Sequence, residues 1–252
     1  MHIISVVNQK GGVGKTNLIT NLSSYLASLN QKVLIIDFDP QGNATSGLGI
    51  DKNQKGIYEI LSQKVGITDA VISVKENLSL IPANQNLAGA NIELVNQIGR
   101  ELILKKQIAK LGNSFDYVFI DNPPSLGLLT VNSLSASDWL LIPVQSEYYA
   151  LEGLSSLLEI VELVQKTFQP NLSILGAVLT MYDKRSRLSS EVWEELYKYF
   201  PGRIFRTIIP RNISLAEAPS FGKSILEYDP SSTGGKAYQR LAKEFLYHFY
   251  AR

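Results

Sequence analysis

Asn8-Gln9-Lys10-Gly11-Gly12-Val13-Gly14-Lys15-Thr16 is the stretch that decides the fold of this chain. It follows the apolar run Ile3-Ile4-Ser5-Val6-Val7, which predicts a buried strand, and it leads into a segment with helical periodicity. Glycines let the backbone approach a ligand closely, while the N–H groups that open a helix attract anions. Strand, glycine-rich turn and helix together predict a loop that binds nucleotide phosphates.

The side chains of this loop have separate predicted roles. Lys15 is expected to reach the β- and γ-phosphates, and the Thr16 hydroxyl is expected to ligate Mg²⁺. The usual pattern, G-x-x-x-x-G-K-T, would have glycine at position 9, but Gln9 stands there and a second lysine, Lys10, follows it. The loop therefore differs from the usual pattern only at its start, where Gln9 and Lys10 stand.

Two predicted strands end in aspartate. Val33-Leu34-Ile35-Ile36 leads to Asp37 and Asp39, and Tyr117-Val118-Phe119-Ile120 leads to Asp121. Near a γ-phosphate, Asp39 would be suited to orienting the attacking water, with Asp37 in support. Asp121 would hold Mg²⁺ through a water, while Thr16 ligates it directly. The alternative is that these aspartates only cap turns, as Asp37 or Asp39 could do before Pro40.

Apolar runs alternate with helical patterns along the chain, which is typical of βαβ units and a mainly parallel sheet. The pattern predicts strands near 2–8, 32–37, 78–81, 116–121, 139–144, 172–180 and 204–209, and helices over 16–29, 91–111, 150–168, 187–199 and 233–249. We therefore expect an α/β fold: a doubly wound sheet with helices on both faces and its ligand site at the carboxyl ends of the strands. Residues 1–252 are predicted to form a single domain.

Composition limits the class of protein. The chain of 252 residues has 24 Lys+Arg against 23 Asp+Glu, so any nucleic acid would be bound by a local patch. Cysteine is absent, which excludes disulfides, thiolate metal sites and iron–sulfur ligation. The phosphate loop begins too early for a signal peptide, and no apolar run approaches the length of a membrane span. We expect a cytoplasmic protein.

The loop K-G-G-x-G-K-T resembles the deviant Walker A box of the ParA/MinD family of P-loop ATPases, with Lys10 as the signature lysine. Asp37-Phe38-Asp39-Pro40-Gln41 is similar to the D-x-D-P-Q box of that family. The stretches 208–212 and 217–220 resemble the short chromosomal ParA branch, also called Soj-like, which lacks a leading helix-turn-helix domain. The resemblance implies that Lys10, Lys15 and Asp39 are catalytic. It implies an ATP site made of Lys10, Gly11, Gly12, Val13, Gly14, Lys15, Thr16, Asn17, Pro210 and Asn212.

One residue of this set departs from the family pattern. Asn17 stands where the family usually has a second threonine. Its backbone N–H can still bind phosphate, so we expect an altered nucleotide affinity at most. Pro210 and Asn212 would line the adenine pocket, an assignment that depends on the resemblance alone.

The resemblance also implies a nucleotide-driven switch. ATP and Mg²⁺ would join two subunits face to face, with Lys10 of each subunit reaching the phosphates of the other. The dimer would bind double-stranded DNA non-specifically and would therefore be associated with the nucleoid. Hydrolysis, slow in the isolated enzyme and stimulated by a ParB-like centromere-binding partner, would release the DNA. The implied function is the partitioning of chromosomes or plasmids.

Positions 181–187 are the predicted DNA-binding surface, with Lys184, Arg185 and Arg187 just before a helix. Non-specific binding needs only phosphate contacts from such side chains. In the Soj-like branch a basic residue at the place of Arg185 helps to bind DNA, and a second one stands where this chain has Ser214. Other cations are possible substitutes: Arg203, Arg206, Arg211, Lys223 and Lys236. The alternative is that 184–187 is only a solvated charge run.

Three further functions stay open. A MinD-like ATPase would bind membrane through its C-terminal helix, but the apolar stripe of Tyr238, Leu241, Ala242, Phe245 and Phe249 more often packs on the protein's own sheet. A metabolic P-loop enzyme would need a substrate pocket with convergent polar groups, which the sequence does not indicate. A ParA-like positioner of another cargo would share every motif described above.

Overall fold

The computed structural model describes residues 1–147, 152–200 and 202–250. In these ranges the strands form one sheet in the order β3-β4-β2-β5-β1-β6-β7. All neighbouring strands are parallel except β3, which pairs antiparallel with β4 at the edge. The strands are β1 (His2–Val6), β2 (Val33–Asp37), β3 (Ile72–Lys75), β4 (Leu78–Ile81), β5 (Tyr117–Asp121), β6 (Trp139–Gln145) and β7 (Ser173–Thr180). The doubly wound α/β fold is confirmed.

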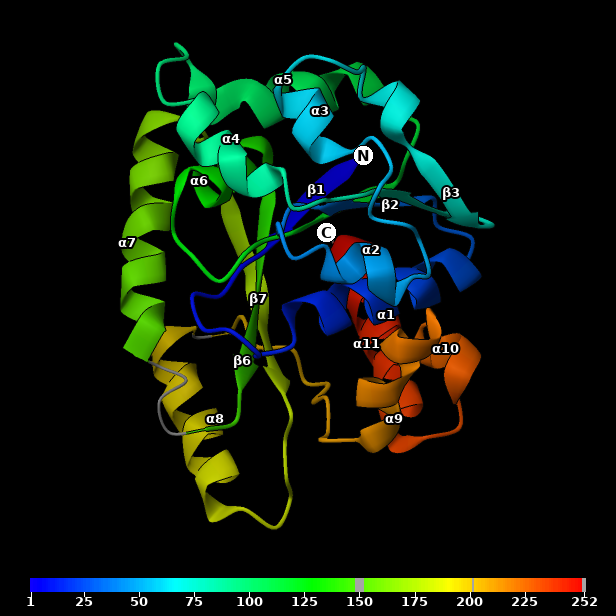
Figure 1. Cartoon of the computed structure of the whole chain (residues 1–252). Helices are drawn as coiled ribbons and strands as arrows, with labels where there is room; N and C mark the ends of the chain where they lie inside the picture. Colours follow the sequence, from blue (N-terminus) through cyan, green and yellow to red (C-terminus); the bar gives the residue numbers. More distant parts are fainter. Residues whose placement is uncertain (148–151, 201, 251–252) are drawn as a thin grey trace.

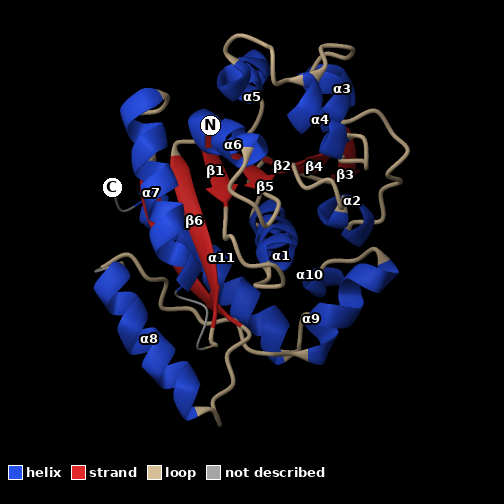
Figure 2. Cartoon of the chain, turned by 60° about the vertical axis from the view of Figure 1, so that its left-hand side comes forward, coloured by secondary structure: helices blue, strands red, loops and turns tan. Residues whose placement is uncertain are grey.

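Helices cover both faces of the sheet. Figure 1 shows α3, α4 and α5 above the sheet and α1 and α11 below it, and Figure 2 shows α7 alongside β6. The lower layer contains α1 (Lys15–Ser28), α2 (Asn43–Gly47), α9 (Ile213–Glu217), α10 (Ile225–Tyr228) and α11 (Thr233–Tyr250). The opposite layer contains α3 (Ile57–Leu61), α4 (Leu87–Glu93), α5 (Ile103–Ile108), α6 (Leu128–Ala136), α7 (Glu152–Thr167) and α8 (Arg187–Tyr199).

The strands are apolar on both sides because both faces of the sheet are covered. In β2, Val33 and Ile35 belong to the core between the sheet and helices α1 and α11. Leu34 and Ile36 belong to the core on the opposite face of the sheet. All four side chains are fully buried. This two-sided burial explains why the sequence showed continuous apolar runs instead of alternation.

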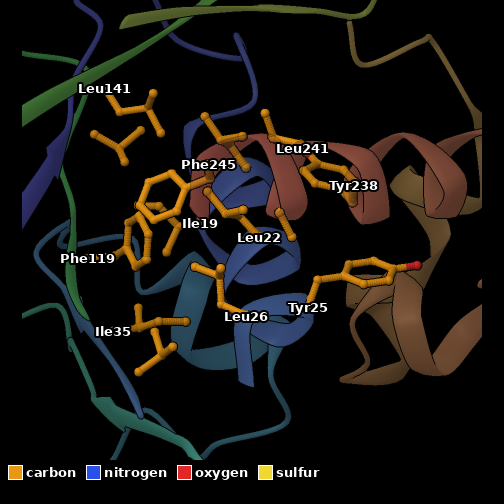
Figure 3. Close-up of a cluster of buried hydrophobic side chains, with 14 of the residues drawn as sticks. Ile19, Leu22, Tyr25, Leu26, Ile35, Phe119, Leu141, Tyr238, Leu241 and Phe245 are labelled. Carbon is orange, nitrogen blue, oxygen red and sulfur yellow. The ribbon is translucent and has the colours of Figure 1, made fainter. Parts of the chain in front are cut away.

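Helix α11 packs its apolar stripe into the core, as the sequence favoured. Figure 3 shows Tyr238, Leu241 and Phe245 facing α1 and the sheet. None of these three side chains is more than 1% exposed. Across the described residues, the helices are too short or too polar to cross a membrane.

Two predicted elements are wrong. The run 204–209 is no strand, because within it only Ile204 forms a bridge, with Ala177, and its backbone pairing with β7 is broken in the middle. The N–H groups of Phe205 and Ile209 still donate to β7. Between them, the N–H groups of Arg206 and Thr207 donate to the Glu244 carboxylate on α11, at 2.6 and 2.8 Å, so no continuous ladder forms.

The predicted helix 91–111 is also wrong. Gly99 interrupts it with a φ of +72°, a left-handed conformation that no continuous helix contains. The segment consists of the end of α4, a 3₁₀ turn at Arg100–Leu102, helix α5 and a second 3₁₀ turn at Ala109–Leu111.

Candidate nucleotide site

The glycine-rich loop lies between β1 and α1 at the carboxyl edge of the sheet, where the sequence predicted it. Gly12 and Gly14 have φ angles of +76° and +89°, so the loop requires glycine at both positions. Gly14 is the N-cap of α1, and the free N–H groups of the first turn follow it. The buried Val13 contributes through its backbone, and its carbonyl accepts a hydrogen bond from Thr180 Oγ1 at 2.8 Å.

A cavity of about 440 Å³ opens over this loop, which we call the phosphate cavity. It brings together predicted residues from the loop and from the segment after β2. It also contains residues to which the sequence assigned no role of their own. Its lining residues are Gly11, Gly12, Gly14, Lys15, Thr16, Asn17, Thr20, Asp39, Gln41, Asn43, Ser46, Gly47, Pro124 and Pro219.

Lys15 is folded back onto the loop. Its Nζ donates to the carbonyl oxygens of Asn8 and Lys10, at 3.1 and 3.3 Å. Burial lowers the pKa of this ammonium group, although the carboxylates of Asp121 and Asp39 act in the opposite direction. The ammonium group is thus held by weak neutral acceptors, which a phosphate oxygen could replace.

Thr16 and Asp121 meet beside the phosphate cavity, as predicted. The Thr16 hydroxyl donates to Asp121 Oδ2 at 2.7 Å, while Asp121 Oδ1 is buried without a hydrogen-bond partner. Burial raises the pKa of Asp121 well above its ordinary value, with Asp37 as the next cause. An unpartnered buried oxygen beside a hydroxyl fits Mg²⁺, which prefers oxygen ligands. Among the described residues no cluster of three acidic or histidine side chains could hold a metal alone, so phosphates and water would complete the shell.

Asp37 and Asp39 have different surroundings. Asp37 is fully buried, and its Oδ2 accepts hydrogen bonds from the N–H and hydroxyl of Thr45, at 2.8 and 2.6 Å. Burial raises the pKa of Asp37 to about 6. Asp39 lines the phosphate cavity, and its Oδ1 accepts the N–H of Gln41 at 2.9 Å. Asp37 therefore fixes the start of α2, whereas Asp39 faces the cavity and also caps its own turn.

A second cavity of about 380 Å³, the side cavity, adjoins the first, since Gly14 and Asn17 line both. Pro210 and Asn212 lie on its wall, where the resemblance placed the adenine. Asn212 is also the N-cap of α9, because its side-chain oxygen accepts the Leu215 N–H at 3.2 Å. Its other lining residues are Gln145, Glu147, Thr180, Met181, Ile209, Arg211, Leu215, Ala216 and Tyr238.

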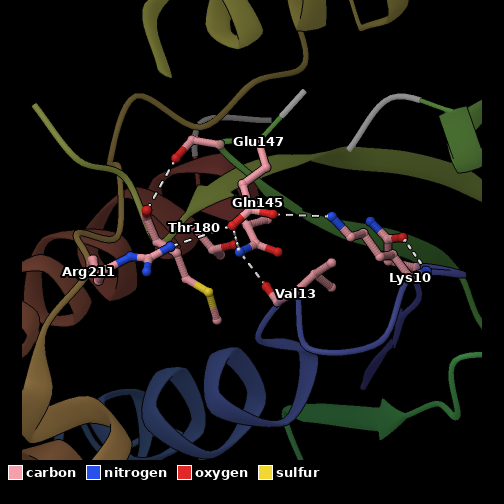
Figure 4. Close-up of polar contacts among 9 residues, drawn as sticks. Lys10, Val13, Gln145, Glu147, Thr180 and Arg211 are labelled. Carbon is pink, nitrogen blue, oxygen red and sulfur yellow. Dashed lines mark hydrogen bonds and ion pairs between the residues drawn. The ribbon is translucent and has the colours of Figure 1, made fainter. Parts of the chain in front are cut away.

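Lys10 contacts a residue to which sequence reasoning gave no role. Figure 4 shows its Nζ facing Glu147, whose Oε2 is 3.4 Å away. Oε1 of the same carboxylate lies 3.5 Å from Arg211 Nη2 and accepts a hydrogen bond from Gln145 Nε2 at 2.7 Å. Glu147 follows β6 at the carboxyl edge of the sheet, and that position was the signal available in the sequence.

A third cavity of about 920 Å³, which we call the basic groove, lies next to the side cavity, and Pro210 and Arg211 line both. It collects cations from three separate segments: Lys184, Arg185, Arg206, Arg211, Lys236 and Arg240. The Arg185 guanidinium is paired with Asp183, at 3.0 Å. The Arg187 side chain lies outside the described part of the chain, and Arg203 and Lys223 are not part of the groove. At the place of the missing second basic residue, the Ser214 hydroxyl contacts Asp229 Oδ2 at 3.2 Å.

Comparison with known proteins agrees with this geometry. A family model described as an AAA domain matches residues 1–174. The chain is 53% identical over 245 residues to the sporulation initiation inhibitor protein Soj of Bacillus subtilis, covering 96% of this chain and 97% of the relative. It is 47% identical to the chromosome-partitioning ATPase Soj of Treponema pallidum, covering 95% of each.

A solved structure is similar over the whole chain. It is that of cobyrinic acid a,c-diamide synthase from Mycobacterium smegmatis with bound ATP analogue and magnesium. Its TM-score is 0.87 at 34% identity, covering 100% of this chain and 96% of that one. Together with the loop, the Thr16–Asp121 pair and Asp39, these matches establish the family: the chain belongs to the Soj/ParA chromosome-partitioning P-loop ATPases.

Proposed function

We propose that this chain hydrolyses ATP with Mg²⁺ in the partitioning of a chromosome or plasmid, and that ATP switches its affinity for DNA. The observation that carries the proposal is the adjacency of the nucleotide cavities and the basic groove. Pro210 and Arg211 form a wall shared by the side cavity and the groove. A nucleotide and a DNA phosphate backbone would thus be bound on two sides of one short segment.

The loop and two acidic residues would perform the hydrolysis. Backbone N–H groups at Gly12 and Gly14 and the Lys15 ammonium group would hold the β- and γ-phosphates. Mg²⁺, when bound beside Thr16 and Asp121, would offset the negative charge that develops during phosphoryl transfer. Asp39, with one oxygen fixed by the Gln41 N–H, would orient the attacking water with its other oxygen.

Lys10 would make the reaction depend on a second copy of the chain. Its side chain is 35% exposed and its contact to Glu147 is a partly solvated ion pair, so little free energy opposes its departure. In a dimer closed over ATP, Lys10 of each subunit would reach the phosphates of the other. Two basic grooves would then act on one DNA molecule, which doubles the phosphate contacts and raises DNA affinity steeply. A ParB-like partner would accelerate hydrolysis and so release the DNA.

Two alternatives are less consistent with these observations. A MinD-like membrane helix would need the apolar face of α11, which is packed against α1 and the sheet. A metabolic role is raised by the name of the Mycobacterium smegmatis protein, but that protein is 34% identical to this chain, compared with 53% for the Soj protein of Bacillus subtilis. The basic groove also has a direct use in partitioning and none in small-molecule chemistry.

Retention on non-specific duplex DNA tests the proposal. Retention is measured for the Asp39→Ala variant, which should hold the ATP state because it cannot position the attacking water. It is measured with ATP, with ADP and without nucleotide. We expect salt-sensitive retention with ATP only, and a loss of retention in Arg185→Ala. Lys166→Ala is the matched control, because Lys166 is an exposed cation on α7, away from the groove. Equal retention in all three nucleotide states, or none in any of them, would contradict the proposal.

A further inference from the structure

The side chain of Asn17 does not face the phosphate loop. Its Nδ2 donates to the backbone carbonyl of Leu215 on α9 at 2.8 Å, and its Oδ1 accepts the Tyr238 hydroxyl of α11 at 2.9 Å. The Leu215 carbonyl can only accept a hydrogen bond, so it must face the Asn17 NH₂ group. The Asn17 oxygen then faces the Tyr238 hydroxyl, which can donate to it, so both contacts fit one orientation of the amide. One side chain on the first turn of α1 therefore binds two C-terminal helices.

Asn21, one turn later on α1, completes this arrangement. Its Nδ2 donates to Asn17 Oδ1 at 3.0 Å, and its Oδ1 accepts the N–H of Ile225 on α10 at 2.7 Å. Asn21 is 3% exposed and Tyr238 is 1% exposed, so water cannot replace these partners without opening the core. We call Asn17, Asn21, Leu215 and Tyr238 the Asn17 tether.

The Asn17 tether forms part of the wall of the side cavity. Asn17, Leu215 and Tyr238 all line that cavity, and Asn17 also lines the phosphate cavity. The surrounding packing leaves little room for adjustment, since a Cβ added at Gly234 of α11 would lie 2.7 Å from Leu215 Cγ. The position of the α9 wall relative to the phosphate loop is therefore fixed by Asn17 on one side and by α11 on the other.

We propose that Asn17 is a positioning residue for the nucleotide base: it holds the α9 wall of the side cavity in register with the phosphate loop. This inference rests on the proposed function, since it takes the side cavity to hold the base. A threonine at position 17 is too short to bind both the Leu215 carbonyl and the Tyr238 hydroxyl, and it would leave one buried group unpaired. The base contacts would weaken, while the phosphate contacts of the loop backbone would remain.

The test separates base from phosphate by using two probes. Binding of Mg·ATP and of Mg·tripolyphosphate is measured by calorimetry for the Asn17→Thr and Tyr238→Phe variants, each combined with Asp39→Ala to prevent hydrolysis. Loss of one hydrogen bond of ordinary strength predicts an ATP affinity about fivefold weaker in each variant. Tripolyphosphate affinity should stay within about twofold, because that probe has no base to position.

Controls make the result specific. Tyr25→Phe removes a hydroxyl from a buried tyrosine farther along α1, labelled in Figure 3, and should leave both affinities unchanged. The double variant Asn17→Thr/Tyr238→Phe should lose little more ATP affinity than either single variant, because both changes break one unit. Tyr238→Phe deletes a single oxygen, so it carries the test even where Asn17→Thr disturbs folding.

The outcomes are distinguishable. Equal losses for ATP and tripolyphosphate would overturn the inference, because Asn17 would then act on the phosphates. Unchanged ATP affinity in both single variants would overturn it as well. A parent chain that binds neither probe would instead contradict the proposed function itself.

Discussion

The double substitution Lys236→Ala/Arg240→Ala tests whether the basic groove binds DNA. Both side chains are exposed on α11, one turn apart, and both line the groove. The sequence named Lys236 as a possible DNA contact but gave no role to Arg240. Neither is fixed in an ion pair within the described residues, in contrast to Arg185 and Arg211 of the same groove.

The expected magnitude follows from counterion release. Each phosphate contact contributes about 0.9 to the slope of log affinity against log salt concentration. The substitutions remove two contacts from each subunit and four from a dimer, so the slope should flatten by about 3.6. Raising salt twofold would then cost the parent protein about 12-fold more affinity than it costs the variant.

The assay is DNA retention of the Asp39→Ala protein with ATP over a salt series from about 50 to 300 mM. Lys243→Ala is the control, because Lys243 is exposed on the same helix but does not line the groove. An unchanged slope in the double variant, or an equal flattening in the control, would refute the assignment of the groove. A flattening of about 1.8 would mean that only one subunit contacts DNA, against the doubled surface of the dimer.

Three other predictions concern the nucleotide site. Thr16→Ala should weaken the Mg²⁺ affinity of the ATP complex at least about tenfold in a metal titration, because it removes a predicted ligand, and unchanged affinity would contradict that role. Because burial raises the pKa of Asp37 to about 6, the folded chain binds a proton that the unfolded chain, with an ordinary value near 4, has lost. The contribution of Asp37 to the free energy of unfolding should therefore fall by up to about 3 kcal/mol as the pH rises from about 4 to 6. Urea titrations in EDTA measure this fall, which should be smaller in the D37N variant. Glu147→Gln should release Arg211 to the groove and steepen the salt slope of ATP-dependent DNA binding by about 0.9 per subunit, whereas an unchanged slope would exclude such a release.

The phosphate and Mg²⁺ site could be predicted from the sequence because its residues are local or lie at the ends of strands. Lys15 and Thr16 adjoin the glycine turn, whereas Asp39 follows β2 and Asp121 ends β5, two strands whose carboxyl ends meet at one edge. Glu147 occupies the same kind of position after β6 and could have been found by the same rule. Tyr238 could not, because it lies on the apolar stripe of α11 and looks like any other core residue there.

The wrong helix 91–111 contained a local warning, Gly99, but the wrong strand has a cause that no local pattern contains. The run 204–209 has the apolar residues of a strand, yet the carboxylate of Glu244, 38 residues after Arg206, accepts the N–H groups of Arg206 and Thr207 in its middle. Edge strand β3 was missed because none of its four residues is fully buried and they show no apolar run. The basic groove was likewise beyond sequence reasoning, since Lys184, Arg206 and Lys236 meet only through packing of the C-terminal segments on α1 and β7.

Light scattering of the Asp39→Ala protein, with and without Mg·ATP, is the most direct test of the switch. The chain has a mass of 27.9 kDa. With Mg·ATP the measured mass should be about twice that of the nucleotide-free protein, and Lys10→Ala in the same background should return it to the monomer value. A mass that does not change with ATP, or that doubles equally without the Lys10 side chain, would contradict a dimer closed over nucleotide by this lysine.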